Sequence, residues 1–366
     1  MSIGIGIIGL PLSGKTTVFN ALTRGKAGTA GHAPGLAPHI AVAKVPDARL
    51  EKLAALFAKP AVPAEVRYAD IGASVKSLVR DKGIGGELLN LLSNADCLIN
   101  VVRAFDNDAV PYPQGSLDIG RDIETMNLEL TFSDLAIIER RLERVKVSLK
   151  SAKAPERLAM MKELDFMERL KAALEKDIPV RELELTPEEL KTTGNYQFLT
   201  AKPLLVIVNI GEERQAGQGD LERELNSRYG KKACRVIALC GRLEMELAQL
   251  DEGEARELRE SYAMTASGAD RAIRESYQLL GLISFFTIGA SEVRAWSIPA
   301  GTPAVRAAGK IHTDMERGFI RAEVIGFEQL ATAGSLAEAR KKGTLRLEGK
   351  DYVVQDGDVM TILFNL

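Results

Sequence analysis

Residues 9–17 read Gly-Leu-Pro-Leu-Ser-Gly-Lys-Thr-Thr, which fits the phosphate-loop pattern G-x-x-x-x-G-K-[ST]. A run rich in β-branched residues, Ile3 to Ile8, precedes the pattern, and apolar residues at helical spacing, Val18 to Leu22, follow it. Strand, glycine loop and helix, in that order, form the context in which this pattern binds phosphate. The sequence therefore predicts a P-loop nucleotide-binding domain of the α/β class.

The chemistry of phosphate binding explains the residue types in this loop. Backbone N–H groups of the loop and of the following helix point at phosphate oxygens, and the helix dipole favours negative charge. Gly14 permits close approach, Lys15 places a cation on the β- and γ-phosphates, and the Thr16 hydroxyl can ligate Mg²⁺. The alternative, a glycine turn with a solvated lysine, is disfavoured by the flanking strand and helix. The predicted nucleotide-binding residues of the loop are Leu12, Ser13, Gly14, Lys15, Thr16 and Thr17.

Length and composition indicate a globular protein of two or three domains. The chain has 366 residues, of which 46% are hydrophobic and 27% charged, and its formal net charge is −2. This balance argues against a generally basic nucleic-acid-binding protein. The three cysteines form no CxxC pair, which suits a reducing compartment. We find no apolar run of membrane-helix length and no signal-peptide pattern, so we expect a cytoplasmic protein with no membrane partner.

Further buried strands are predicted downstream of the loop. Short apolar runs with polar flanks span Cys97 to Val102, Leu204 to Val208 and Arg235 to Leu239. Strands that are apolar on both faces are typical of a parallel sheet covered by helices. The chain to about residue 280 is therefore predicted to be α/β.

Two stripes of apolar residues with coiled-coil spacing interrupt this α/β pattern. The first stripe consists of Leu135, Ile138, Leu142, Val145 and Leu149. The second consists of Met160, Leu164, Met167, Leu170 and Leu174. The pattern breaks around Pro155, so we predict an antiparallel helical hairpin that projects from the α/β domain. Two ordinary surface helices remain the alternative.

From about Leu282 onward the sequence predicts a different order of strands and helices. Phe319 to Ile325 and Lys350 to Val354 are predicted strands, a helix runs through Leu336 and Ala339, and a final strand covers the last residues. Glycines punctuate the turns between them. The sequence thus predicts a small α+β domain with its own core.

A candidate base-recognition segment follows the predicted strand at Leu204. It reads Asn209-Ile210-Gly211-Glu212, where GTP-binding proteins of this class carry N-K-x-D and use the aspartate to read guanine. Here Ile210 replaces the lysine, and Glu212 is one methylene longer than aspartate. Asn209 can still meet a base edge, because its amide both donates and accepts hydrogen bonds. The segment therefore favours adenine, or a relaxed choice of base, over strict guanine recognition.

With these residues in hand, the chain resembles the Obg-like ATPase or YchF subfamily of translation-factor-related P-loop proteins over nearly its whole length. Its most specific matches lie near the C-terminus, at 309–324 and 352–359, which resemble the family's TGS domain, a β-grasp-like fold. The other matching segments are Gly9–Leu22, Val45–Leu50, Val101–Phe105, Asn209–Glu212 and Leu243–Leu247.

The resemblance implies three parts and a function. The parts are a P-loop domain at 1–124 and 200–281, a helical hairpin inserted at 125–199, and a TGS domain at 282–366. The implied function is slow hydrolysis of ATP in preference to GTP, with association with ribosomes or RNA.

Three positions depart from the family pattern at its hydrolytic centre. The second-switch motif D-x-x-G is Asp70-Ile71-Gly72-Ala73 here, so Asp70 can still reach the shell around Mg²⁺ while Ala73 replaces the glycine. Gly35 stands where the first switch supplies a threonine to Mg²⁺. Tyr112 stands where the family places a histidine that orients the attacking water.

We therefore predict a cytoplasmic ATPase switch that couples its nucleotide state to a translation-related partner. Lys15, Asp70 and Tyr112 are the predicted catalytic residues, and Mg²⁺ is the expected cofactor, held by Thr16 with Asp70 in its second shell. The three departures keep open a non-hydrolysing ATP sensor. A true GTPase is the third alternative.

Overall fold

The computed structural model describes residues 3–25, 39–71, 85–262, 264 and 266–365. Contacts divide the chain into two compact units. The first unit comprises Ile3–Ala41 and Arg67–Ala272, and the second comprises Val42–Val66 and Ile273–Leu366. The division predicted from sequence differs from these units chiefly at Val42–Val66, which it placed with the P-loop.

The first unit is built on a six-stranded sheet in the order β2-β4-β1-β5-β6-β7. β1 is parallel to β4 and β5, and β6 is parallel to β5 and β7, so these strands end at one edge of the sheet. The three strands predicted downstream of the loop are confirmed as β5, β6 and β7. The bounds are β1 Gly4–Ile8, β2 His39–Lys44, β4 Glu65–Asp70, β5 Cys97–Ala104, β6 Leu204–Ile210 and β7 Cys234–Leu239.

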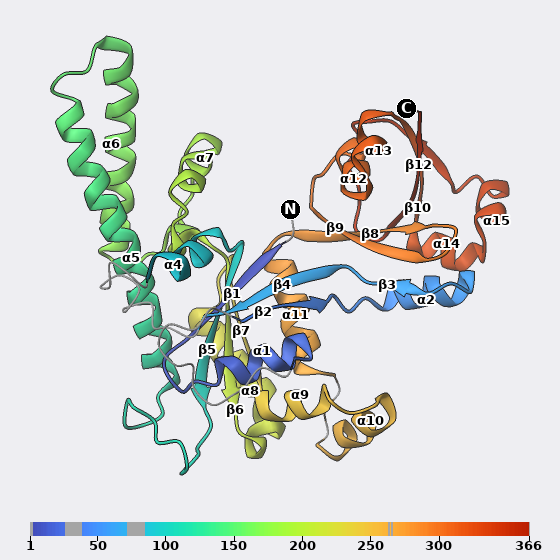
Figure 1. The fold of residues 1–366 in the computed structure, drawn as a ribbon, viewed down its shortest axis with the longest axis horizontal. Helices are drawn as coiled ribbons and strands as arrows, with labels where there is room; N and C mark the ends of the chain where they lie inside the picture. The colour runs from blue at the N-terminus through green and yellow to red at the C-terminus, as the bar shows by residue number, and fades with distance from the viewer. Residues whose placement is uncertain (1–2, 26–38, 72–84, 263, 265, 366) are drawn as a thin grey trace. The chain divides into compact units, whose positions relative to one another are not determined.

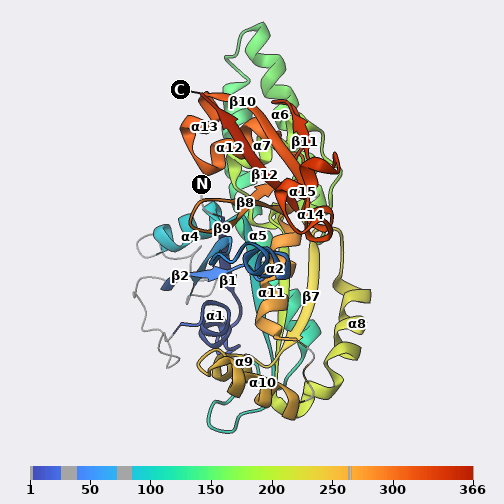
Figure 2. The same cartoon turned by 90° about the vertical axis from the view of Figure 1, so that its right-hand side faces the viewer.

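Helices pack on both faces of this sheet, which explains why β5 and β6 are buried along their whole length. Figure 2 shows α1 and α8 on opposite sides of the strands. Among the described residues, the helices other than the hairpin are α1 Lys15–Thr23, α4 Gly85–Asn94, α7 Pro187–Tyr196, α8 Gln218–Tyr229, α9 Gly241–Leu247, α10 Glu252–Ser261 and α11 Gly268–Leu279, the last of which continues into the second unit.

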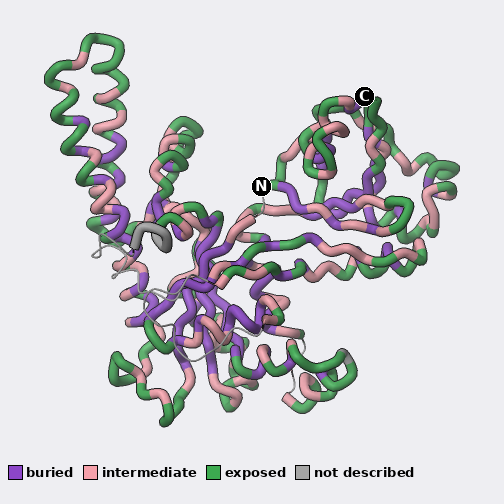
Figure 3. The backbone as a smooth tube through the Cα atoms, viewed as in Figure 1, coloured by how far each residue is buried: buried purple, intermediate pink, exposed green. Residues whose placement is uncertain are grey.

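The predicted hairpin is confirmed as α5, Ile119–Ser148, and α6, Ala154–Leu174, which run side by side in Figure 1. Both predicted stripes contribute to one buried cluster, in which Ile138 and Leu142 meet Met167 and Leu170. Pro155 lies in the first turn of α6, where its missing N–H has no cost. Figure 3 shows the buried residues near the sheet and the exposed residues toward the hairpin tip.

The buried carboxylate of Asp134 ties α5 to the chain that returns from the hairpin. It accepts hydrogen bonds from the backbone N–H groups of Leu199 and Thr200, at 2.9 and 2.7 Å, and from the Thr200 hydroxyl at 2.6 Å. These residues begin the short helix η2, Leu199–Ala201, just before β6. The hairpin is thus fixed to the sheet at the amino end of β6.

The second unit contains a six-stranded sheet in the order β11-β10-β12-β8-β9-β3. The predicted strands at 319–325 and at the end of the chain are confirmed as β10 and β12, but 350–354 forms a turn with one isolated bridge from Val353 to Pro303. The strands are β3 Ala61–Val62, β8 Leu282–Ile288, β9 Val293–Pro299, β10 Phe319–Gly326, β11 Arg346–Glu348 and β12 Asp358–Phe364. The helices are α2 Ala48–Phe57, α12 Ala304–Ile311, α13 Thr313–Arg317, α14 Phe327–Ala333 and α15 Leu336–Lys341.

Arg49 of α2 explains why the segment Val42–Val66 packs with the C-terminal strands. Its guanidinium donates to Asp47 at 2.8 Å and to Asp356 at 2.7 Å, and it lies 5.4 Å from the ring centroid of Phe286. Asp356 also accepts from the backbone N–H of Ser284 at 2.9 Å. One arginine thus links residues distant in sequence, which sequence patterns alone did not reveal.

The helices and the cysteines of the described residues bear on the membrane and redox expectations. In that part of the chain, none of the helices is both long and apolar enough to span a bilayer. All three cysteines, Cys97, Cys234 and Cys240, are free and buried.

Candidate active site

The phosphate loop joins β1 to α1 through three residues with positive φ. The angles are 154° at Gly9, 61° at Leu12 and 89° at Gly14. A Cβ atom on Gly9 would lie 2.4 Å from the Val101 carbonyl oxygen, and one on Gly14 would lie 2.2 Å from Nδ2 of Asn209. Both positions therefore require glycine for conformation and for space.

The amino end of α1 has the properties of an anion site. Gly14 is the N-cap of α1, and within the described chain no side chain caps the helix. The first backbone N–H groups are therefore left for an external acceptor, and the helix dipole adds positive potential there. Thr17 lies in this first turn, and the side chain of Leu12 is exposed on the loop.

Lys15 is the cation of the loop, and it is almost buried. Its ammonium donates to the carbonyl oxygens of Gly9 and Leu10, both at 3.1 Å. Burial lowers the pKa of Lys15, and the nearby negative charge of Asp70 partly opposes that shift. A positive charge in this low-dielectric setting acts strongly on any phosphate bound to the loop.

Thr16 and Asp70 meet beside Lys15. The Thr16 hydroxyl donates to Oδ2 of Asp70 at 2.7 Å, and the Asp70 side chain is fully buried at the end of β4. The pair is brought together because β1 and β4 are parallel neighbours with Ile7 opposite Asp70. Two oxygen atoms at this spacing, one from a hydroxyl and one from a carboxylate, are suitable ligands for a hard divalent cation such as Mg²⁺.

Asn209 holds the phosphate loop from the neighbouring strand β6. Its Nδ2 donates to the Ser13 carbonyl oxygen at 3.0 Å, and its Oδ1 accepts from the backbone N–H of Gly241 at 3.0 Å. Both ends of its amide are therefore engaged by backbone, which differs from the predicted contact with a base edge. Side chains alternate along β6, so Ile210 packs into the core with Val208 instead of facing the loop.

Replacing Asn209 with alanine is expected to weaken nucleotide binding about tenfold and to lower the free energy of unfolding by about 2 kcal/mol, because two buried backbone groups lose their partners. Asn226 is a matched control, since its amide also bridges backbone, accepting from and donating to Val236 at 3.0 and 2.6 Å. Asn226→Ala should lower stability by a similar amount with unchanged affinity. Calorimetric titration and urea unfolding measure both quantities; equal affinity losses in the two variants would contradict the assignment.

Glu212, at the start of the helix η3, Glu212–Gly217, already has partners. Its carboxylate accepts from the Tyr262 hydroxyl at 2.9 Å and lies 3.8 Å from Nε of Arg242. Reading guanine requires one carboxylate to accept two hydrogen bonds from the base. The Tyr262 contact takes up part of the accepting capacity of this carboxylate, and the expectation that guanine is not strictly recognised stays a prediction.

Arg103 is a site residue that the sequence analysis missed. It is 2% exposed, and its guanidinium donates to the carbonyl oxygens of Leu12 at 3.5 Å, Phe105 at 3.1 Å and Val110 at 2.9 Å. It also lies over the ring of Tyr112, 5.1 Å from the centroid. Arg103 therefore connects the phosphate loop to the segment after β5. A charged residue inside the apolar run of β5 was the signal that could have revealed it.

Tyr112 lies in that same segment. Its hydroxyl donates to Asp122 at 2.5 Å, and Asp122 is paired with Arg121 at 3.0 Å. Burial, together with the Asp122 carboxylate, raises the pKa of Tyr112 above its ordinary value. The hydroxyl therefore stays protonated near neutral pH, so Tyr112 is a donor and not a base.

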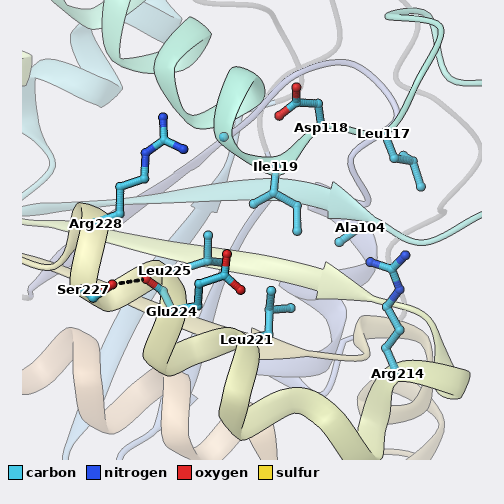
Figure 4. Close-up of a pocket in the computed structure, with 11 residues that line it drawn as sticks. Ala104, Leu117, Asp118, Ile119, Arg214, Leu221, Glu224, Leu225, Ser227 and Arg228 are labelled. Atoms are coloured by element: carbon cyan, nitrogen blue, oxygen red, sulfur yellow. Dashed lines mark hydrogen bonds between the residues drawn. The ribbon is translucent and has the colours of Figure 1, made fainter.

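A separate cavity of about 420 Å³ lies between the start of α5 and α8 (Figure 4). Ile119, Leu221 and Leu225 form apolar walls, and Arg214 and Glu224 stand at its border. Its walls include none of the predicted site residues. The phosphate site is thus formed by the loop and the helix α1, not by this cavity.

Comparison with known proteins identifies the family of this chain. The YchF-GTPase_C family model, described as "Protein of unknown function (DUF933)", matches residues 282–365. Over 371 residues, and with all of both chains covered, this chain is 39% identical to a Bacillus subtilis protein named Ribosome-binding ATPase YchF. The chain belongs to the YchF family. A protein of the same name from Escherichia coli O157:H7 is 39% identical over 373 residues, again with full coverage of both chains.

A solved YchF structure has the same fold. The Schizosaccharomyces pombe YchF GTPase superposes with a TM-score of 0.83 at 27% identity, covering 99% of this chain and 98% of that one. The family resemblance and the predicted fold class, a P-loop α/β domain with a helical hairpin and a C-terminal α+β domain, are thereby confirmed. Of the three departures from the YchF pattern, Gly35 and Ala73 lie outside the described residues, and Tyr112 is placed as above.

Proposed function

We propose that this protein hydrolyses ATP at the phosphate loop and acts as a ribosome-linked nucleotide switch. The observation that carries the proposal is the convergence of Lys15, the open amino end of α1 and the Thr16–Asp70 pair at one edge of the sheet. The relatives named above as ribosome-binding ATPases match the whole chain and support the same activity.

Each group has a part in the proposed reaction. The loop N–H groups and the Lys15 ammonium hold the phosphates and stabilise the charge that develops during phosphoryl transfer to water. The Thr16 hydroxyl would ligate Mg²⁺, and Asp70 would hold its water shell, since both supply hard oxygen ligands. When bound, Mg²⁺ would neutralise charge on the β- and γ-phosphate oxygens.

ATP is the proposed substrate in preference to GTP. The Glu212 carboxylate is engaged by Tyr262 and Arg242, and Ile210 is turned into the core, so the elements that read guanine in N-K-x-D proteins are missing from this segment. Relatives carry both ATPase and GTPase in their names, so the base preference needs its own test.

The ribosome, or its RNA, is the proposed partner, and the cytoplasm the proposed location. The names of the relatives support ribosome binding. The parts proposed from sequence to lie outside the nucleotide domain, the hairpin at 125–199 and the TGS domain at 282–366, are the candidates for that contact.

Calorimetric titration of the full chain with ATP, GTP and a non-hydrolysable ATP analogue in the presence of Mg²⁺ tests the proposal, with phosphate release followed in parallel. We expect ATP to bind more tightly than GTP and to be turned over slowly. Tight ATP binding without phosphate release would favour the sensor alternative. Selective GTP binding would refute the proposed base preference.

Replacing Tyr112 with phenylalanine tests the proposed water-orienting role of its hydroxyl. We expect turnover to fall about tenfold with nucleotide affinity unchanged, because the hydroxyl oxygen, which donates its proton to Asp122 and can still accept a hydrogen bond from water, is lost while the ring stays over Arg103. The pH profile of turnover should not change near neutrality, because the raised pKa keeps the tyrosine protonated there. Steady-state rates between pH 6 and pH 9 (roughly the range in which His and Cys also titrate) measure both the drop in turnover and its pH profile. If Tyr112→Phe turns over ATP at the original rate, Tyr112 has a structural role only.

A further inference from the structure

A second cavity, of about 450 Å³, lies where the helical hairpin joins the sheet of the first unit. We call it the root cavity. Its size falls within the range of small-molecule sites, about 300–1,000 Å³. Its walls come from the first turns of α5, from residues 177–182 after α6, and from β6 and β7; those used below are Asn127, Leu130, Arg181, Leu204, Val206 and Lys231.

The root cavity is distinct from the nucleotide site. Leu204 and Cys234 are the first residues of the parallel strands β6 and β7, and both line the cavity. The phosphate loop follows the last residue of β1, and β1 is parallel to β5 and hence to β6 in the same sheet. The two sites therefore lie at opposite edges of the strands.

Arg181 is a cation of this cavity without an anionic partner. It belongs to the short helix η1, Val180–Glu182, and its Nη1 donates to the Thr200 carbonyl oxygen at 3.3 Å. Its Nε is buried and has no hydrogen-bond partner among the described residues. In the same part of the chain the guanidinium forms no ion pair, and the carboxylates of Glu182 and Asp134 act on it only at longer range. Burial lowers the pKa of Arg181, the direction expected for a cation that is poorly compensated.

The buried carboxylate of Asp134 is held by Leu199 and Thr200 outside the lining, and the charges of the lining itself leave the root cavity positive. Arg228 is paired with Glu124 at 2.7 Å. Asp177 and Glu182 are exposed, where water screens them, and Lys231 adds a second cation at the rim. Arg181 is only partly exposed, and a charge largely withdrawn from water is normally paired, so its missing ion-pair partner points to a bound anion.

The remaining walls define the rest of the ligand. Leu130, Leu204 and Val206 form an apolar floor. The Oδ1 atom of Asn127 is buried and lacks a partner among the described residues, so a donor on the ligand would satisfy it. An inorganic anion would leave this apolar floor unused.

We propose that the root cavity binds a small organic anion, a carboxylate or phosphate carried on an apolar or flat body, through the guanidinium of Arg181. The site is independent of the proposed ATPase activity, and β6 connects it to Asn209 beneath the phosphate loop.

Isothermal titration calorimetry of the full chain with phenyl phosphate and, separately, benzoate tests this proposal, with phenol as the uncharged control. The two anions share a ring and so distinguish a phosphate site from a carboxylate site. We expect one of them to bind and phenol not to bind. Arg181→Gln should weaken that binding at least about tenfold, since a charge-assisted hydrogen bond is lost. Arg144→Gln, which changes an exposed arginine of α5, should not.

Two further variants show whether the probe binds in the root cavity itself. Lys15→Ala should leave probe binding unchanged, because the probe does not use the phosphate loop. Asn127→Phe should abolish it by filling the cavity while Arg181 remains. Arg181→Gln should keep its melting temperature, since a partly exposed cation without an ion pair stabilises little. Failure of both anions to bind, equal binding by Arg181→Gln, or loss of binding in Lys15→Ala would overturn the proposal.

Discussion

Replacing Lys15 with alanine is expected to lower ATP turnover at least about 100-fold, the effect of removing one preorganised group that stabilises transition-state charge. The Lys15 ammonium is held inside the loop by the carbonyl oxygens of Gly9 and Leu10, so it needs little reorganisation to meet a phosphate. Steady-state phosphate release at saturating ATP measures the change. Calorimetry in parallel separates lost affinity from lost chemistry.

Lys202 provides the matched control for Lys15. Its ammonium is also mostly withdrawn from solvent and donates to two carbonyl oxygens, of Ser93 at 2.8 Å and Ala95 at 2.6 Å, and burial likewise lowers its pKa. Lys202→Ala should therefore reproduce any structural cost of losing a carbonyl-bound ammonium while turnover is retained. Turnover that survives in Lys15→Ala would place the chemistry elsewhere and refute the proposed active site.

The second large effect is expected for Gly14→Ala, which should abolish measurable nucleotide binding. The added Cβ would lie 2.2 Å from Nδ2 of Asn209 at a backbone φ of 89°, so the loop must shift or Asn209 must release Ser13. Backbone strain of this kind costs about 1–3 kcal/mol before the collision is counted. Calorimetric titration with ATP measures the loss, and urea unfolding measures the strain.

Gly334→Ala is a control that has the backbone strain of Gly14→Ala without its steric clash. Gly334 has a similar φ of 77°, but a Cβ there would meet no atom within 4 Å. Gly334→Ala should lower the free energy of unfolding by about 1 kcal/mol, the cost of an alanine in the left-handed region, and leave ATP affinity unchanged. If Gly14→Ala binds ATP as tightly as Gly334→Ala, the close packing of the loop against Asn209 is not needed for binding.

Much of the fold was predictable because its signals are local. The hairpin followed from apolar stripes three and four residues apart, and Pro155 marked the turn between its helices. The buried strands followed from short apolar runs, as at β6. The predicted strand at 350–354 was wrong, because its hydrogen bonds are those of a turn with a single bridge at Val353.

The site was only partly predictable, for a physical reason. The loop residues are contiguous, so their spacing identified Lys15 and Thr16. Arg103 braces Leu12, which is far from it in sequence, and no local pattern reports such a contact. The Asn209 amide was expected at a base edge, and only the packing of β6 against the loop shows that it holds Ser13 and Gly241 instead.

By itself, the sequence determined the class of protein: a phosphate loop between a strand and a helix, an inserted hairpin and a separate C-terminal domain. Tertiary structure alone decided which side chains meet. It placed Arg103 against Leu12, grouped Val42–Val66 with the C-terminal strands through Arg49, and left Arg181 without an ion-pair partner in the root cavity. The reason is that local periodicity specifies helices and strands, whereas the pairing of buried charges depends on strand order and register, which bring distant residues together.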